Sequence, residues 1–166
     1  MLVRLAKVRL SMIVSLTGLS LLLSGCGFQL AGQQPLPQWM ESVALQADDT
    51  RSDVYLALER ELIDRGVVIS ASSSQSLSLS AVDTGQRVLS VSARNIPREF
   101  EVFYTTAFSL SRDQEVVLEQ PPLTLTRDYQ WSELEVLGKV REEQLLRELI
   151  VDDLVDSILR QIATLD

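Results

Sequence analysis

Apolar and polar residues alternate along much of the second half of the chain, a period of two that predicts strands buried on one face. The clearest case runs from Glu99 to Leu110. Its apolar face holds Phe100, Val102, Tyr104, Thr106, Phe108 and Leu110. At about 3.3 Å per residue such a strand is roughly 40 Å long, so it is expected to dominate the sheet.

A second long strand is expected over residues 115–131, after a turn at Arg112–Gln114. Leu123, Leu125, Tyr129 and Trp131 share its apolar parity. Pro121-Pro122 interrupts the strand, which predicts a bulge or a sheet edge. Arg127 also falls on the apolar parity. Its side chain has three possible environments: an ion pair, a position at the end of the core, and full exposure to solvent. We favour the last two.

Residues 67–69 have the composition to begin a strand, but the polar residues 70–74 interrupt it. Shorter strands are expected at residues 41–47, 76–81 and 87–93. The turn-forming residues Asp83–Gln86 lie between the last two, so this pair predicts a β-hairpin. In the second arm Leu89, Val91 and Ala93 are expected to face the core. Pro97 then interrupts the pattern within residues 94–98, which indicates a turn, a bulge or an edge.

A first helix is predicted over residues 50–66. Thr50 and Asp53 have the spacing of a capping box, and Gly66 stands where a helix-ending glycine is expected. Val54, Leu58 and Leu62 share one face of this helix, which we therefore expect to pack on the sheet.

The last predicted helix runs from about Lys139 to Leu165, a stretch without glycine or proline. Its apolar arc comprises Ile150, Val151, Leu154, Val155, Ile158, Leu159 and Ile162. Glu143 with Arg147 and Asp156 with Arg160 have the spacing of favourable ion pairs. The element order β-α-β-β-β-β-α predicts an α+β fold, a two-layer sandwich with a mixed, mostly antiparallel sheet and two helices on one face.

The N-terminus has a different character. Three basic residues precede an apolar run from Leu10 to Leu23, the organisation of a secretory signal. The run is too short to span a bilayer as a helix. Leu23-Ser24-Gly25-Cys26 resembles the bacterial lipobox, which implies removal of residues 1–25 and lipid attachment at Cys26. The expected domains are the signal at 1–25, a lipidated tether at 26–40 and a folded domain at 41–166.

Charge and composition narrow the function. Without residues 1–25 the chain keeps 12 basic and 23 acidic residues, a formal charge of −11, which disfavours binding to nucleic acid. It contains no histidine, and Cys26 is the only cysteine. The acid pairs Glu142-Glu143 and Asp152-Asp153 point to different sides of a helix and are interpreted as solvated surface. We expect neither an enzyme, nor a metal site, nor a cofactor.

Three sets of residues resemble the LptE family of lipopolysaccharide-assembly lipoproteins. They are Cys26–Leu30 with Gly32 and Leu36-Pro37, then Arg127–Tyr129, then Glu142–Leu145 with Glu148 and Asp152. Leu149 departs from the methionine that family members often carry. The resemblance implies an outer-membrane lipoprotein, anchored by its acyl chains on the periplasmic side. It also implies that the protein plugs the lumen of an LptD-type β-barrel, helps this barrel to assemble, and binds lipopolysaccharide.

Two alternatives remain open: a periplasm-facing carrier of lipid or lipoprotein, and a scaffold lipoprotein of another barrel-assembly complex. For lipopolysaccharide we expect a small cationic site, because its phosphates need positive charge on this acidic protein. Arg94 and Arg98 flank the Pro97 interruption, and Lys139 stands at the start of the last helix. If both segments lie at one end of the domain, these three residues are expected to form a phosphate clamp.

Overall fold

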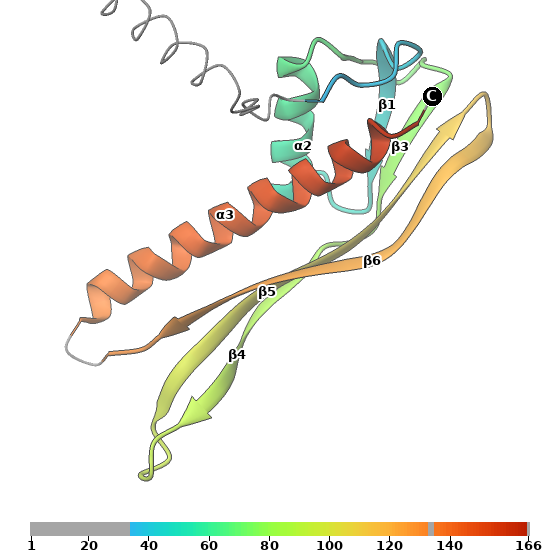
Figure 1. The fold of residues 1–166 in the computed structure, drawn as a ribbon. Coiled ribbons are helices and arrows are strands. Elements are labelled where there is room, and N and C mark those ends of the chain that lie inside the picture. Colours follow the sequence, from blue (N-terminus) through green and yellow to red (C-terminus); the bar gives the residue numbers. More distant parts are fainter. Residues whose placement is uncertain (1–33, 133–134, 166) are drawn as a thin grey trace, which may run out of the picture. The chain divides into compact units, whose positions relative to one another are not determined.

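The computed structural model describes residues 34–132 and 135–165, which belong to one compact unit. With the labels of Figure 1, its elements are β1 (Ser42–Ala47), α2 (Asp53–Asp64), β2 (Val68–Ile69), β3 (Gln75–Leu79), β4 (Asp83–Val91), β5 (Pro97–Arg112), β6 (Glu115–Gln130) and α3 (Val136–Ile162). The expected signal, Cys26 and most of the expected tether lie outside the described residues.

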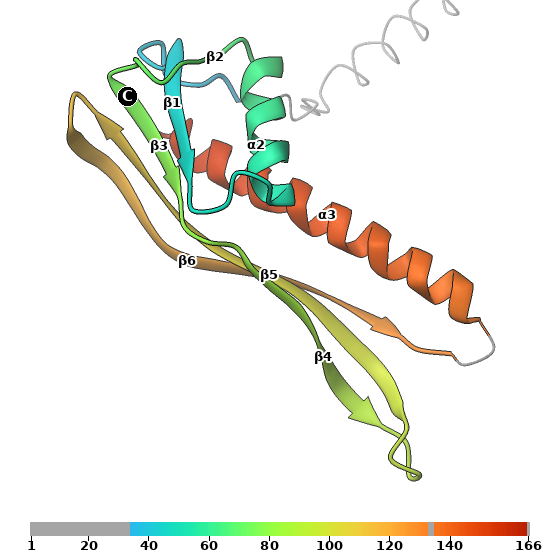
Figure 2. The same ribbon diagram turned by 180° about the vertical axis from the view of Figure 1, so that it is seen from behind.

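β5 is the central strand of the sheet. Along one side it pairs with β6, and along the other it pairs first with β4 and then with β3. β1 joins β3 in parallel and β2 joins β1 in parallel, whereas all pairs with β5 are antiparallel. Both helices lie on the same face (Figures 1 and 2). The predicted α+β fold with a mixed sheet and two helices on one face is confirmed.

The predicted hairpin between residues 76–81 and 87–93 is wrong. β3 and β4 do not pair with each other; they follow one another along the same side of β5. Asp83–Gln86 is strand instead of turn, because these residues pair with β5 from Thr105 to Val102. Gly85 allows the Phe103 ring to lie close to the backbone of β4, because a Cβ at this position would lie 3.0 Å from Cζ of Phe103. The real hairpin joins β4 to β5.

The inward orientation predicted for Leu89, Val91 and Ala93 is also wrong, since all three side chains are exposed. The pairing register shifts between Val88 and Ser90, so a simple period of two does not hold in this part of β4. The end of β4 also extends beyond the helices, as Figure 1 shows. These apolar side chains have no core to enter.

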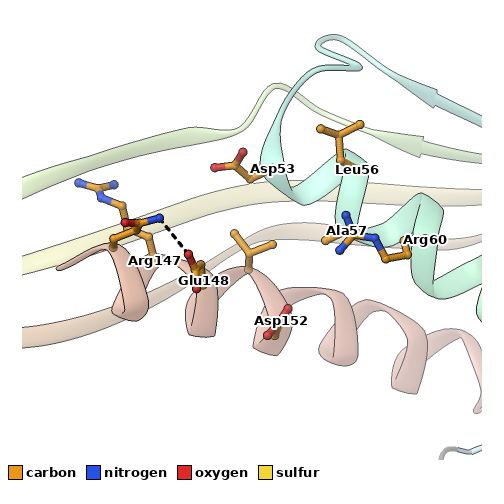
Figure 3. A pocket seen from close by; sticks show the side chains of 9 residues that line it. Asp53, Leu56, Ala57, Arg60, Arg147, Glu148 and Asp152 are labelled. Atoms are coloured by element: carbon orange, nitrogen blue, oxygen red, sulfur yellow. Dashed lines mark hydrogen bonds between the residues drawn. The ribbon is translucent and has the colours of Figure 1, made fainter. Parts of the chain in front are cut away.

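α2 begins and ends on local signals. Ser52, and not Thr50 of the predicted capping box, is its N-cap, and the Ser52 side chain accepts a hydrogen bond from the backbone N–H of Tyr55. Gly66 ends the helix as predicted, with a φ of 84° that glycine adopts without strain. Between α2 and α3 lies a recess lined by residues of both helices, among them Leu56, Arg60 and Glu148 (Figure 3).

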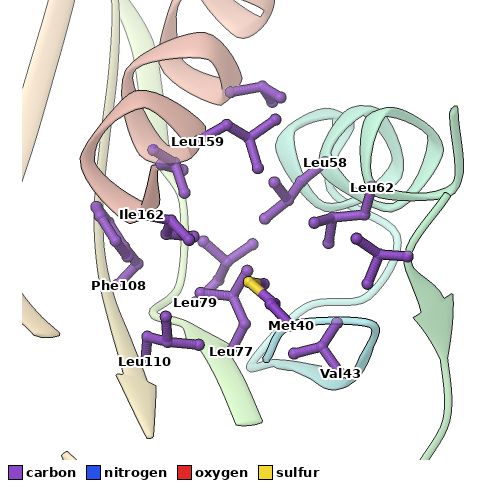
Figure 4. Packing of buried hydrophobic residues seen from close by; sticks show 13 residues of the cluster. Met40, Val43, Leu58, Leu62, Leu77, Leu79, Phe108, Leu110, Leu159 and Ile162 are labelled. Carbon is purple, nitrogen blue, oxygen red and sulfur yellow. The ribbon is translucent and has the colours of Figure 1, made fainter. Parts of the chain in front are cut away.

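The core fills the space between both helices and the sheet. The predicted apolar faces are confirmed: Val54, Leu58 and Leu62 of α2 and all seven residues of the α3 arc are buried. One cluster lies under α2 and the end of α3 (Figure 4). A second cluster lies under the middle of α3. Met40 is fully buried in the first cluster, and Leu36 and Trp39 pack against it, so the end of the expected tether contacts the core.

β6 is continuous through Pro121-Pro122, and the register shift beside them is the predicted bulge. Arg127 forms an ion pair with Asp153 of α3, in place of the unpaired positions that the sequence favours. This carboxylate faces β6 from the edge of the apolar arc. The pair therefore ties α3 to the sheet.

α3 begins at Val136, three residues earlier than predicted, and includes Gly138. The predicted pair of Glu143 and Arg147 is present, with 2.8 Å between Oε1 and the guanidinium. Asp156 pairs with Arg65 of the α2 C-cap at 3.7 Å, and not with Arg160 as predicted. A tertiary partner thus replaces the local one.

Candidate ligand site at the hairpin end

The β4–β5 hairpin carries the first candidate residues. Its tip, Ser92–Ile96, is closed by a backbone hydrogen bond of 2.8 Å from Ser92 to Ile96, and the Ser92 hydroxyl accepts a second from the Ile96 N–H at 3.2 Å. Asn95 adopts a positive φ of 59°, which asparagine tolerates better than most residues. Arg94 therefore projects from a defined turn.

Arg94 and Arg98 line one recess of about 300 Å³ at this end of the sheet. Its lining consists of Ser92, Arg94, Ile96, Pro97, Arg98, Trp131 and Ser132. Both arginines are exposed, and neither forms an ion pair with a described residue. The recess thus combines two cationic groups with an aromatic wall, and no carboxylate of a described residue lines it.

Lys139 lies at the same end, near the start of α3, but in a different recess. That recess is lined by Leu89, Glu99, Asp128, Tyr129, Gln130, Lys139 and Glu142. The Lys139 ammonium donates to Glu142 at 2.7 Å, and its side chain is only 17% exposed. The structure thus brings Arg94 and Arg98 into one recess, while Lys139 pairs with Glu142 in a recess that Glu99 and Asp128 also line.

A polar network fixes the first half of α3 over the sheet. Gln86 of β4 donates to the Tyr129 hydroxyl, which donates to Glu143 at 3.0 Å; Arg147 holds the same carboxylate and donates to Thr84 at 3.3 Å. Burial, followed by the hydrogen bond to Glu143, raises the pKa of Tyr129 to about 12. Tyr129 therefore remains a donor at physiological pH, and three elements are linked beyond the apolar core.

Trp131 is the residue of the recess that sequence reasoning misses. Its parity along β6 predicts a core position, and its ring does pack edge-on against Phe100, with centroids 5.9 Å apart. The ring is only partly buried, however, because β6 ends at this point. An aromatic residue directly after the end of a strand, opposite an exposed arginine, is the signal that could have found it.

The rest of the described surface gives no sign of a metal site or of a membrane-spanning helix. Among the residues described, no group of three or more acidic, cysteine or histidine side chains has a geometry suited to a metal ion. No helix in the described ranges combines the length and apolarity needed to cross a membrane. The recess between α2 and α3 (Figure 3) carries charges of both signs around Leu56 and Val151. None of these features indicates a catalytic site.

Comparison with known proteins gives consistent results. The family model described as "LptE: Lipopolysaccharide-assembly" matches residues 40–162. The chain resembles the solution structure of the uncharacterized lipoprotein B from Nitrosomonas europaea, with 27% identity over 82% of this chain and 90% of that one, at a TM-score of 0.69.

Two crystal structures share the fold. For the rare lipoprotein B from Shewanella oneidensis, the identity is 22%, the coverage 74% of this chain and 94% of that one, and the TM-score 0.63. For the minor lipoprotein from Acinetobacter baumannii, the identity is 23%, the coverage 76% of this chain and 93% of that one, and the TM-score 0.60. The search among curated proteins gave no match.

Proposed function

Because the chain belongs to the LptE family of lipopolysaccharide-assembly proteins, we propose that it is an outer-membrane lipoprotein that acts as plug and assembly partner of an LptD-type β-barrel. We further propose that it binds lipopolysaccharide and has no catalytic activity. The observation that carries the proposal is the extent of the family match, since residues 40–162 include the core, both helices and the hairpin end.

The way in which the two layers are held together supports a plug. A plug inside a water-filled barrel keeps its fold through its own core and through the contacts between its two layers. The Arg127–Asp153 pair and the network of Gln86, Tyr129 and Glu143 provide such contacts along α3. They extend the contact between helix and sheet beyond the buried clusters.

The packing of the core disfavours the lipid-carrier alternative. A carrier needs an apolar cavity that is large enough for an acyl chain. Here the layer between the helices and the sheet is occupied by side chains such as Leu58, Leu77 and Leu159, which are fully buried (Figure 4). An acyl chain would have to displace these side chains.

The anchor belongs to the same proposal. Lipid attachment at Cys26 would hold the protein in the inner leaflet of the outer membrane, and more than one acyl chain suffices for stable anchoring. Residues 26–33 would then connect the lipid to the described unit, which begins at Gln34. This arrangement leaves the unit free to enter a barrel from the periplasmic side.

Affinity purification from detergent-solubilised outer membranes tests the partnership. A tagged full-length chain is expected to retain a stoichiometric β-barrel protein of LptD type, identified by mass spectrometry. The matched control is an unrelated outer-membrane lipoprotein with the same tag. Recovery of a different barrel would favour the scaffold alternative, and recovery of no barrel would contradict the plug.

A further inference from the structure

We infer that the folded part of the chain consists of two cooperative halves, divided across the middle of the sheet, and that one half opens by itself while the other stays folded. The half that opens comprises β4, β5 up to Thr105, β6 from Leu123 onward, and α3 up to Leu154; we call it the hairpin half. The other, the α2 half, comprises α2, β1, β2, β3 and the remaining parts of β5, β6 and α3.

The buried core is divided at this level. On β5, Tyr104 belongs to the cluster under the middle of α3, and Phe108 belongs to the cluster under α2 and the end of α3. Thr106 lies between them. Its side chain is 2% exposed, and its hydroxyl donates to the Ser80 carbonyl at 3.3 Å. Ala57 of α2 packs against both clusters. A buried hydroxyl thus stands on β5 where apolar packing would otherwise continue.

The strand pairing on one side of β5 also changes at this level. The pairing of β3 with β5 ends at Leu79, and the pairing of β4 with β5 begins at Asp83. Between these positions, the Ser80 backbone donates to the Ala107 carbonyl at 2.9 Å, and the Ser80 hydroxyl accepts from the Ala107 N–H at 2.8 Å. A side chain therefore takes the place of a backbone acceptor in the ladder.

On its other side, β5 faces the bulge of β6. The paired residues of β6 on either side of this bulge are Gln120 and Leu123. Pro121 and Pro122, which lie between them, therefore both stand opposite Ala107. Proline has no backbone N–H, so neither residue can donate a ladder hydrogen bond. The ladder is thus weakened on both sides of the same residue of β5.

The hairpin half has fewer interactions to hold it together. Its sheet consists of three strands, and neither β4 nor this part of β6 pairs with a further described strand. Among the described residues, its core cluster contains seven buried side chains, whereas the cluster of the α2 half contains thirteen. Regions with few buried apolar side chains open at a lower free energy than the main core. The hairpin half is therefore the one expected to open first.

The helix α3 crosses the divide and is tied to each half by a separate ion pair. Asp153 pairs with Arg127 of β6 in the hairpin half, and Asp156 pairs with Arg65 of the α2 C-cap in the α2 half. Breaking the first pair leaves the second intact. Arg65 also donates to the Gln34 carbonyl at 3.4 Å, so the described start of the chain belongs to the α2 half. Opening thus releases β4 and the first part of α3 while the residues next to the proposed anchor keep their fold.

Native-state hydrogen exchange of the full-length chain in detergent, followed by mass spectrometry, tests this inference. Two stretches of the central strand are compared, residues 99–105 in the hairpin half and residues 108–112 in the α2 half. Both stretches are paired on their two sides, so the exposure of an edge strand does not affect the comparison. After correction for intrinsic rates, residues 99–105 are expected to exchange at least about tenfold faster. Equal protection of both stretches would overturn the inference.

Two leucines of α3 provide matched variants, because both are fully buried but belong to different clusters. Leu154→Ala is expected to raise exchange at residues 99–105 by about tenfold or more and to leave residues 108–112 unchanged. Leu159→Ala is expected to raise exchange at residues 108–112. Equal acceleration of both stretches by Leu154→Ala would show a single cooperative unit and would contradict the inference.

Thr106→Val tests the divide itself, because it replaces the buried hydroxyl by a methyl group of similar size. The substitution is expected to reduce the ratio of the two exchange rates about three- to tenfold, since the clusters gain apolar contact across the divide. Thr105→Val is the control. It removes a hydroxyl that bonds to Thr124 at 2.8 Å, outside both clusters, and is not expected to reduce the ratio. An unchanged ratio in Thr106→Val would contradict the division at this residue. The proposed function does not depend on any of these results.

Discussion

At the scale of single residues, two glycines illustrate how position determines the effect of a side chain. Gly85 of β4 lies under the ring of Phe103, where a Cβ would approach two ring carbons to 3.0 and 3.1 Å. Gly138 lies in the first turn of α3, where a Cβ would meet nothing within 4 Å. The same substitution should therefore have opposite effects at these two positions.

Gly85→Ala is expected to lower the free energy of unfolding by about 1 kcal/mol, because the Phe103 ring has to shift. Gly138→Ala is the matched control, and it should raise the free energy of unfolding by roughly 0.5 kcal/mol through helix propensity. Urea denaturation measures both values. Equal changes of the same sign would contradict this account of Gly85.

Tyr129 gives stability a dependence on alkaline pH. Its pKa is about 12 in the folded protein and 10.0 when unperturbed, so the folded state holds this proton more tightly. The stabilisation is complete below pH 10 and is lost as the pH rises from 10 to 12, by roughly 2 to 3 kcal/mol in total. Burial, and next the charge of Glu59, also raise the pKa of Tyr55, so some dependence remains without Tyr129.

We expect the Tyr129→Phe variant to show a shallower loss of unfolding free energy between pH 10 and 12 than the wild type. Denaturant unfolding at a series of pH values measures the two slopes. Because Tyr129→Phe also removes the hydrogen bond to Glu143, the comparison uses the slopes and not the absolute stabilities. Identical slopes would show that the Tyr129 hydroxyl does not titrate as described.

At the scale of elements, local patterns predict what local contacts decide. The period of two identifies β5 correctly and the apolar arc identifies α3 correctly, because both elements bury one face along most of their length. The pairing of β4 depends on β5 and on where the helices end, and neither is visible in residues 83–93 alone. The partner of Arg127 is likewise 26 residues away, on another element.

The candidate site shows the same division. Arg94 and Arg98 can be found from the break at Pro97, which marks a hairpin end. The pairing of Lys139 with Glu142 follows a helix spacing of three residues and is open to prediction. The role of Trp131 is not open to prediction, because its ring becomes part of a recess only through the end of β6 and the position of the hairpin.

Two leucines of α3 test the assignment of its buried and exposed sides. Leu154 is fully buried in the second cluster, whereas Leu149 is 53% exposed. Leu154→Ala is expected to reduce the free energy of unfolding by about 2–5 kcal/mol. Leu149→Ala should change it by less than about 0.5 kcal/mol. Thermal and urea unfolding of both variants measure the difference, and similar losses would contradict this orientation of α3.

At the scale of the whole molecule, the proposal joins a lipid anchor to a folded unit. Cys26→Ser is expected to prevent acylation and outer-membrane localisation without affecting the fold of the unit from Gln34 onward. Incorporation of a labelled fatty acid in cells measures acylation, and membrane fractionation measures localisation. Ser24→Ala, which keeps the cysteine, serves as control. Labelling that persists in Cys26→Ser would refute the assignment of the anchor.

The central claim is that the protein serves the export of lipopolysaccharide as partner of a β-barrel. Its most direct test is the amount of lipopolysaccharide accessible at the surface of cells depleted of the protein, with re-expression of the wild-type chain as control. We expect surface lipopolysaccharide to fall as the protein is depleted, together with the folded form of the partner barrel, and to recover on re-expression. Unchanged surface lipopolysaccharide after complete depletion would contradict the account.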